Sequence, residues 1–152
     1  MADQTLKQRL TEEMKTAMRA KAKQRLGTIR LIQAEIKRIE VDERIDIDDA
    51  RVLAVLDKMR KQRRDSIEQF TKGDRLDLAE IEEAEVLVIE EFLPAAIDDS
   101  EIESLIISAI SSTGAESMRD MGKVMGVLKP QLQGRADMSV VSQKIKAALA
   151  AS

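Results

Sequence analysis

Residues 76–94 read LDLAEIEEAEVLVIEEFLP, and the fold class depends on how this stretch folds. Taken alone, the apolar run Val86–Ile89 is as typical of a short buried strand as of a helix. Over the whole stretch, apolar residues recur at the spacing of one helical face: Leu78, Ile81, Ala84, Val88 and Phe92. A periodic pattern of this length favours a helix over a strand, so we predict a helix from Leu76 to Phe92.

Pro94 marks the clearest break in the chain. Proline has no backbone N–H to donate, and it biases the preceding Leu93 away from helical geometry. The segment LPAAIDDS is therefore predicted to be a hinge. We expect an N-terminal helical domain over residues 1–94 and a C-terminal domain over residues 95–152.

Three further helices are predicted before residue 76, each from an apolar stripe in its own register. The first runs from about Thr5 to Ala20 and has the stripe Leu6, Leu10, Met14, Ala17 and Met18. The second has the stripe Leu26, Ile29, Ile32, Ile36 and Ile39. We place the break between the two helices near Lys21–Lys23. The third helix has the stripe Val52, Val55, Leu56, Met59, Ile67 and Phe70.

The third helix has signals at both ends. Asp46, Asp48 and Asp49 precede it, where carboxylates cap a helix and complement its positive end. Gly73 follows it, where a left-handed C-terminal cap favours a residue without a Cβ atom.

After Pro94 the sequence predicts three short helices. Three groups of capping residues open them: Asp98, Asp99 or Ser100, then Ser117, then Asp137 or Ser139. Gly114 and Gly134 end the first two. Their inward residues are Ile102, Leu105, Ile106, Ala109 and Ile110, then Met118, Met121, Met125, Leu128 and Leu132, then Val141, Ile145 and Leu149. The predicted fold is all-α, an N-terminal helical bundle followed by a small three-helix C-terminal lobe.

Composition excludes several classes of chemistry. Among 152 residues there is no cysteine and no histidine, which removes disulfides, thiolate sites and the commonest general base. The acidic run Glu80–Glu91 is best explained as solvated, because a di-metal helix site also needs Glu-x-x-His. The serines between Ser104 and Ser112 have neither elbow glycines nor a base. We expect no catalytic residue, no metal site and no cofactor.

Neither a membrane span nor a signal peptide is predicted. No apolar stretch approaches the roughly 18 residues that a spanning helix needs, and the N-terminal MADQTLKQRL lacks an apolar centre. From this we expect a cytoplasmic protein that does not contact a membrane.

The net charge of −3 hides an asymmetry along the chain. Residues 1–75 hold 19 basic and 14 acidic side chains, whereas residues 76–152 hold 6 and 14. The first half is therefore basic, with a balance of +5, and one face of it can attract phosphate while the whole protein stays acidic.

Two basic groups stand out in the first half. Lys21, Lys23, Arg25 and Arg30 surround the first helix junction, and Arg60, Lys61 and Arg64 lie on the third helix. Phosphate binding and simple solvation remain alternative readings of both groups. Arg63 differs, because it lies within the apolar stripe. We expect its charged group either to extend to solvent or to pair with a carboxylate, which the following acidic helix could supply, and not to bind a ligand.

In the acidic half, nearly all cations gather around the sequence GKVMG and the last helix. This set comprises Lys123, Lys129, Arg135, Lys144 and Lys146, with Gly134 among them. The spacing does not fit a phosphate loop, which needs four residues between its glycines. Gly122 and Gly126 instead indicate close approach of a neighbouring helix or of a ligand. Because the only aromatics are Phe70 and Phe92, stacking on bases is a minor mode, and any RNA partner is expected to be folded RNA.

The sequence resembles the GatB/YqeY family, which includes free-standing YqeY-like proteins and the tail domain of GatB, a component of the aspartyl/glutamyl-tRNA amidotransferase. The resemblance is carried by TIRLIQAEIKRIEV, by KQRRDSIEQFTKGDRLDLAEIEEAEVLVIEEFLP and by MRDMGKVMGVLKPQLQGRADMSVVSQKIKAAL, over nearly the whole chain.

This resemblance implies a helical N-terminal bundle with a three-helix C-terminal lobe, and a grip on tRNA without the catalytic body of the amidotransferase. By motif it implies tRNA contact at Gly122, Lys123, Gly126, Lys129, Gly134 and Arg135. The partner is expected to be tRNA or another folded RNA, with a protein of the tRNA amidation or translation machinery as a further possibility.

Three functions stay open from the sequence. The first is a tRNA-binding accessory module. The second is a helical protein adaptor that docks a partner through exposed Met and Ile side chains, for which complete burial of Met118, Met121 and Met125 would be contrary evidence. The third, least supported, is a carbon–nitrogen ligase that uses glutamine, a label inherited through the family and without a visible nucleophile.

Overall fold

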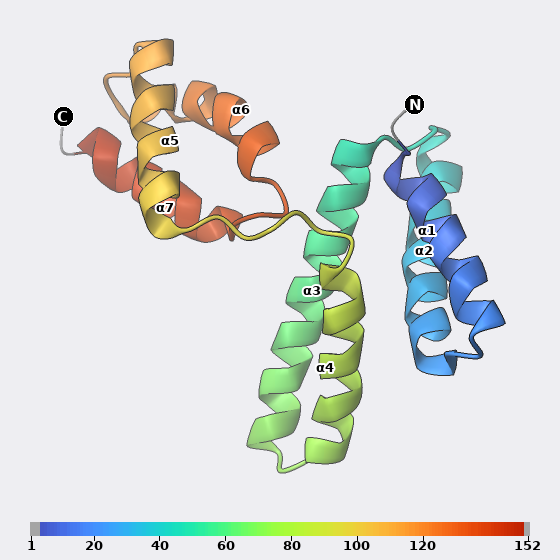
Figure 1. Cartoon of the computed structure of the whole chain (residues 1–152). Coiled ribbons are helices and arrows are strands. Elements are labelled where there is room, and N and C mark those ends of the chain that lie inside the picture. The colour runs from blue at the N-terminus through green and yellow to red at the C-terminus, as the bar shows by residue number, and fades with distance from the viewer. Residues whose placement is uncertain (1–3, 151–152) are drawn as a thin grey trace. The chain divides into compact units, whose positions relative to one another are not determined.

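The computed structural model describes residues 4–150, and within this range the chain is entirely helical apart from its turns and connecting segments (Figure 1). Seven α-helices and one short 3₁₀ helix occur there, and no strand. The prediction of an all-α fold is confirmed. The chain divides into two compact units, Met1–Pro94 and Ala95–Ser152, which are described separately.

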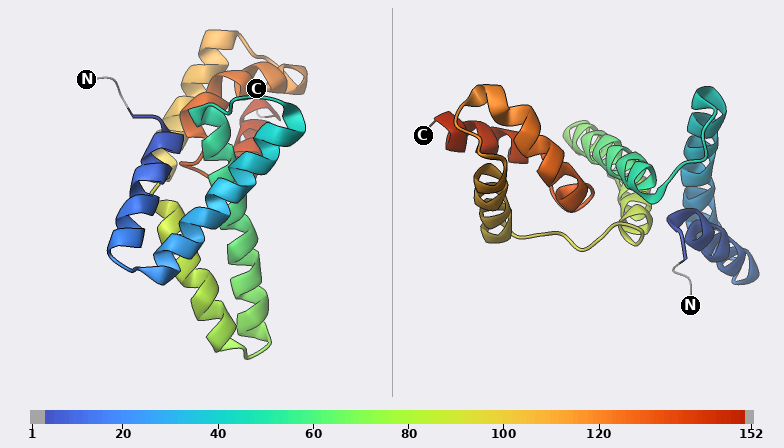
Figure 2. Two further views of the ribbon diagram at one scale, coloured as in Figure 1. Left: turned by 90° about the vertical axis from the view of Figure 1, so that its right-hand side faces the viewer. Right: turned by 90° about the horizontal axis from the view of Figure 1, so that it is seen from above.

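The first unit consists of two antiparallel helix pairs that pack on each other (Figures 1 and 2). One pair is α1 (Leu6–Arg19) with α2 (Lys23–Glu43), and the other is α3 (Asp49–Lys72) with α4 (Leu76–Glu90). Their apolar stripes meet in one core, in which the most deeply buried side chains are Leu10, Ile29, Ile32, Val52, Leu56, Ile89 and Phe92. The predicted stripes therefore locate most of this core.

The stretch that left helix and strand as alternatives is helical. Val86, Val88 and Ile89 are buried, whereas Leu87 between them is 69% exposed. Burial on two sides of α4 follows from its position, because α4 packs against α3 and also against α2. Contact with two partners explains the continuous apolar run without a strand.

The ends of the helices follow local capping chemistry. Thr5 and Gln8 form a capping box at the start of α1. Asp48 caps α3 by accepting a hydrogen bond of 2.9 Å from the Arg51 backbone N–H. The left-handed cap predicted at Gly73 is wrong: Gly73 has a φ of −85°, and Asp74 has a φ of +58°. An aspartate tolerates this conformation better than most residues, so the turn closes one position later than expected.

The far end of the α3–α4 pair is less buried than its stripes predicted. Ile67 and Phe70 are only half-buried and Ile81 is 56% exposed, although all three were expected to face the core. Buried side chains of α3 end at Met59. The physical reason is that α1 and α2 cover only one part of the longer α3–α4 pair, so its far end has no third layer (Figure 1).

The second unit is a small bundle of α5 (Asp99–Thr113), α6 (Met121–Leu132) and α7 (Met138–Ala150), with a 3₁₀ helix at Met118–Asp120 before α6 (Figure 1). Its core contains the buried side chains Ile102, Ile106, Ala109, Val124, Leu128, Leu132, Val141, Ile145 and Leu149. Gly114 and Gly134 have the positive φ angles, +68° and +79°, that C-terminal caps favour.

The methionine stripe predicted for this unit is partly wrong. Met118 belongs to the 3₁₀ helix and is 47% exposed, while Met121 and Met125 are half-buried. Val124, which the predicted stripe omitted, is fully buried. Met118 leaves the predicted line because it lies in the 3₁₀ turn before α6. Within α6, Val124, Leu128 and Leu132 form the centre of the inward face, and Met121 and Met125 pack at its edge.

Candidate nucleic-acid interface

One face of α6 exposes backbone instead of side chains. Gly122 and Gly126 are both exposed, and a Cβ atom added at either would meet no atom within 4 Å among the described residues. Lys129, three residues further, continues the same face because residues at i, i+4 and i+7 align on a helix. It is exposed and forms no ion pair with a described residue. We call these three residues the glycine face of α6.

Gly134 and Arg135 lie at the turn after α6 and contribute to the structure of the unit. Gly134 is buried in its left-handed conformation. Arg135 donates from Nε to the Ala95 carbonyl at 3.3 Å, and its own carbonyl accepts from the Ile97 backbone N–H at 3.1 Å. These bonds fix the segment before α5 to the end of α6. Arg135 also lines an open groove of about 630 Å³, which it shares with Ile97, Ser100, Glu101, Ser104, Leu105, Pro130 and Gln131.

The other predicted cations of the second unit point in different directions. Lys123 lies 3.7 Å from Asp120, and its side chain is 69% exposed. Lys144 faces α5, where its Nζ lies 3.6 Å from a Glu103 oxygen. Lys146 is exposed and forms no ion pair with residues 4–150. Residues two positions apart on a helix differ by about 200° around its axis, so Lys146 lies on the side of α7 away from Lys144. The predicted set is therefore not one continuous positive surface.

Most arginines of the two basic groups predicted in the first half of the chain form ion pairs with acids of the same unit. Arg25 is paired with Glu13, at 3.0 Å, and with Glu91. Arg60 is paired with Asp57 at 2.7 Å, and Arg64 with Glu90 at 3.1 Å. By contrast, three exposed lysines and one exposed arginine of these groups form no ion pair within the described chain: Lys21, Lys23, Lys61 and Arg30.

Arg63 behaves as the apolar stripe around it predicted. Its Nε donates to a Glu85 oxygen on α4 at 2.6 Å, and the two side chains are only 15% and 18% exposed. This pair lies inside the α3–α4 contact, so Arg63 stabilises the helix pair and is not available to a ligand.

An ion-pair network that the sequence did not reveal joins α1 to the end of α2 and to the loop before α3. Lys7 Nζ lies 2.7 Å from a Glu40 oxygen and 2.9 Å from an Asp46 oxygen. The hydrogen bond from Lys7 is the main reason why the pKa values of both carboxyls are lowered, and the pKa of Lys7 is raised by its bonds to the two acids. Glu40 and Asp46 are 33 and 39 positions from Lys7, so no local sequence spacing predicts these contacts.

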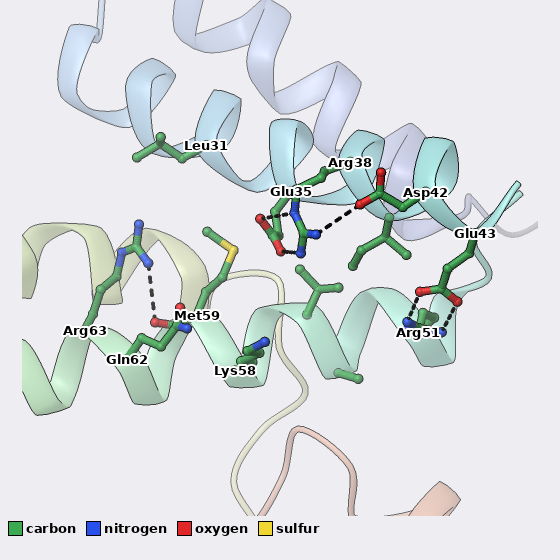
Figure 3. Close-up of a pocket in the computed structure, with 13 residues that line it drawn as sticks. Leu31, Glu35, Arg38, Asp42, Glu43, Arg51, Lys58, Met59, Gln62 and Arg63 are labelled. Carbon is green, nitrogen blue, oxygen red and sulfur yellow. Dashed lines mark hydrogen bonds and ion pairs between the residues drawn. The ribbon is translucent and has the colours of Figure 1, made fainter. Parts of the chain in front are cut away.

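A groove of about 580 Å³ lies between α2 and α3 (Figure 3). Arg38 bonds Glu35 and approaches Asp42, and Arg51 forms two hydrogen bonds with Glu43. The hydrogen bond from Arg38 lowers the pKa of Glu35. Charges on the rim therefore largely neutralise one another, which makes this groove a poor site for a polyanion.

Two features that often mark reactive sites, clustered metal ligands and unpartnered buried polar atoms, do not occur among the described residues. Residues 4–150 contain no group of three or more acidic side chains placed to hold a metal ion. Within the same range, every buried side-chain nitrogen and oxygen has a hydrogen-bond partner. None of the helices described combines the length and apolar character that crossing a bilayer requires. What this arrangement can do is bind anions through exposed cations and exposed helix backbone.

The family described as Yqey-like protein matches residues 7–149 of the chain. Among curated relatives, "Altered inheritance of mitochondria protein 41, mitochondrial" of Pyrenophora tritici-repentis is 37% identical over 142 residues, which cover 91% of this chain and 77% of the relative. The protein of the same name from Lachancea thermotolerans is 32% identical over 143 residues, covering 90% and 76%. That from Kluyveromyces lactis is 30% identical over 146 residues, covering 93% and 75%.

These relatives contradict the cytoplasmic location expected from the sequence, because all three carry names that call them mitochondrial. The expectation rested on the lack of an apolar segment. An apolar segment is the mark of secretory signals, whereas segments that direct proteins to mitochondria are amphipathic and rich in arginine and serine. The criterion therefore does not register segments of the mitochondrial kind.

Proposed function

We propose that this chain, which belongs to the Yqey-like protein family, is a tRNA-binding accessory protein without a catalytic centre of its own. In this proposal the glycine face of α6 is the main point of contact. The partner is tRNA or another folded RNA, since two phenylalanines in the whole sequence are too few for base stacking to dominate.

The observation that supports the proposal most is the pair of open glycines on α6. Glycine inside a helix is less favourable than alanine by roughly 0.5–1 kcal/mol, so a packing reason is expected for each. Apart from the adjoining backbone of α6 itself, no described atom lies within 4 Å of a Cβ built at Gly122 or Gly126, which leaves no packing contact within residues 4–150 to require them. A partner that approaches the helix backbone closely would require both.

Unpaired cations of the second unit supply the electrostatic part of the mechanism. Lys129 belongs to the glycine face, and neither Lys129 nor Lys146 is neutralised by an acid of residues 4–150. Each phosphate that a lysine neutralises releases counterions from the RNA, which makes binding dependent on salt but not on sequence. Shape selects among RNAs, because the bare backbone of α6 fits only a surface that can come close to it.

The test is retention of tRNA by the purified full chain at graded salt. We expect binding at low ionic strength that weakens steeply as salt rises. Lys129→Gln is expected to weaken binding several-fold, whereas Lys72→Gln is the matched control because Lys72 is paired with Glu68 at 2.9 Å in the other unit. Absence of salt-sensitive retention in the unmodified chain overturns the proposal. Because the relatives carry mitochondrial names, mitochondrial tRNA is tested beside total tRNA.

A protein adaptor is the second candidate, and one observation favours it. Met118 is 47% exposed, and Met121 and Met125 are only half-buried, so the burial that would argue against docking through this stripe is not present. A pull-down from native lysate with and without RNase separates the two functions. A partner that survives RNase supports the adaptor, and one that is lost supports RNA binding. A glutamine-dependent ligase would instead show tRNA-dependent amide formation by this chain alone.

A further inference from the structure

The outer face of α2 carries a regular row of cations. Lys23, Arg30 and Lys37 follow one another at intervals of seven residues, which places them on one line along the helix. Between them lie Gly27, Ala34 and, at the end, Val41. All six positions are exposed. We call Lys23, Arg30 and Lys37 the cation row of α2.

No acid of the described chain neutralises this row. The nearest charged neighbours on α2 are already committed: Arg38 bonds Glu35 and Asp42, and Glu40 bonds Lys7. Lys23, Arg30 and Lys37 form no ion pair with residues 4–150. Glycine and alanine, which present no charge and little bulk, separate the cations. The row is therefore an uninterrupted positive strip.

The dimensions of the strip follow from helix geometry. Seven residues rise about 10.5 Å, so the three cations extend over roughly 21 Å of the helix axis. Lysine and arginine side chains are long and flexible, and each can reach a phosphate beside the axis. The strip therefore suits a ligand with negative charges repeated along a line.

Composition distinguishes a polyanion from a protein partner. Stable protein interfaces have a central group of large apolar or aromatic side chains, and lysine is depleted in them. The strip offers only Gly27 and Ala34 between its cations and Val41 beyond Lys37, which is too little apolar area for such a centre. Phosphate contacts need cations and close approach, and small residues permit close approach.

We propose that the cation row of α2 is a second RNA-binding surface, which contacts the phosphodiester backbone independently of the glycine face of α6. The inference rests on the proposed RNA-binding function and adds a site on the other unit. Lys37, which the basic groups recognised in the sequence do not include, belongs to it. Arg25, which they do include, does not, because Glu13 and Glu91 hold it.

The test compares two triple variants of the full chain by tRNA binding at graded salt. In the first, Lys23, Arg30 and Lys37 are each changed to Gln, which keeps good helix propensity. We expect the slope of log affinity against log salt to fall by about 2–3 and the affinity near 0.1 M salt to fall about 10- to 100-fold. The matched control changes three exposed cations that already have acid partners to Gln: Arg38, Arg51 and Lys72. It alters net charge equally and is expected to change the slope by less than about one.

The outcomes separate this inference from the proposed function. If the unmodified chain binds no tRNA, both fail. If it binds tRNA and the Lys23/Arg30/Lys37 variant keeps the same slope, or if the control loses as much, the cation row is not an RNA surface although the proposed function stands. A change in oligomeric state of the row variant, with unchanged RNA binding, would assign the strip to an acidic protein surface and also overturn the inference. Far-ultraviolet circular dichroism confirms that both variants are folded.

Discussion

Replacing Gly122 and Gly126 together by alanine is expected to stabilise the protein and to weaken its binding to RNA. Higher stability together with weaker RNA binding is the result expected only if the glycines serve contact with a partner. Each replacement adds one methyl group to an exposed helical position with no described atom within 4 Å of it. The substitution therefore introduces no clash with the described part of the chain.

The magnitude follows from helix propensity and the size of the unit. Alanine in a helix interior is favoured over glycine by roughly 0.5–1 kcal/mol, so the double variant gains about 1–2 kcal/mol. For a unit the size of residues 95–152, 1 kcal/mol shifts Tm by about 4–8 °C. We expect the transition of this unit to rise by about 4–16 °C. Two methyl groups between the backbone and the RNA are expected to lower affinity about tenfold, which corresponds to about 1.4 kcal/mol.

Calorimetry of the full chain measures the first effect, and tRNA binding at fixed low salt measures the second. Gly114→Ala is the matched control, because it makes the same chemical change in the same unit and also meets open space. Gly114 has a φ of +68°, where a Cβ atom is strained by roughly 1–2 kcal/mol. This control is expected to lower the transition of the same unit, which identifies that transition in the melting curve, and to leave RNA affinity unchanged.

Two results would refute the reasoning. A lower transition temperature for the Gly122/Gly126 double variant would mean that a contact inside the protein needs these glycines. A higher transition temperature with unchanged RNA affinity would mean that nothing approaches this face closely, and the glycine face would lose its assigned role.

Three further predictions concern stability. Because the pKa of Glu40 is lowered, its bond with Lys7 stabilises the fold above pH 4.5, and this stabilisation is lost as the pH falls through the lowered pKa. The free energies of unfolding in urea of Lys7→Met and of the unmodified chain should therefore converge in acid, and a difference that stays constant with pH would contradict this. Asp74→Gly removes left-handed strain of roughly 1–2 kcal/mol at φ +58° and adds a chain-entropy cost of roughly 0.5–1 kcal/mol, so it should stabilise the first unit by at most about 1 kcal/mol; a lower denaturation midpoint would count against the strain. Arg63→Met leaves Glu85 unpaired at 18% exposure and should cost about 1–3 kcal/mol, most of which a further Glu85→Leu should restore; no recovery in the double variant would disprove the pairing argument.

Local patterns predicted those parts of the fold that depend on neighbouring residues. The spacing of Leu78, Ala84 and Val88 predicted a helix where four apolar residues in a row resembled a strand, and α4 is that helix. The caps at Gly114 and Gly134 followed from the need for a positive φ angle. The same argument failed at Gly73, because the conformation of a turn depends on how two helices meet as well as on the residue.

The candidate site was less predictable, since charge along the sequence does not show which charges remain free. Arg25 and Lys23 belong to one basic group, yet Arg25 meets Glu91, which is 66 positions away, and Lys23 meets no acid of the described chain. Lys37 did not stand out in the sequence, because the other cations of its row, Arg30 and Lys23, lie seven and fourteen positions away. Its place in the cation row became visible only once the buried side of α2 was known.

The amino-acid order, read locally, was enough for the helices, their approximate ends and the all-α class, because hydrogen bonding within a helix and the segregation of apolar from polar faces act over a few residues. Packing between helices determined which apolar stripes are buried and which arginines pair with a distant carboxylate. It also determined which cations and glycines remain exposed. These outcomes depend on contacts between residues far apart in the chain, whose energies no short window of sequence contains.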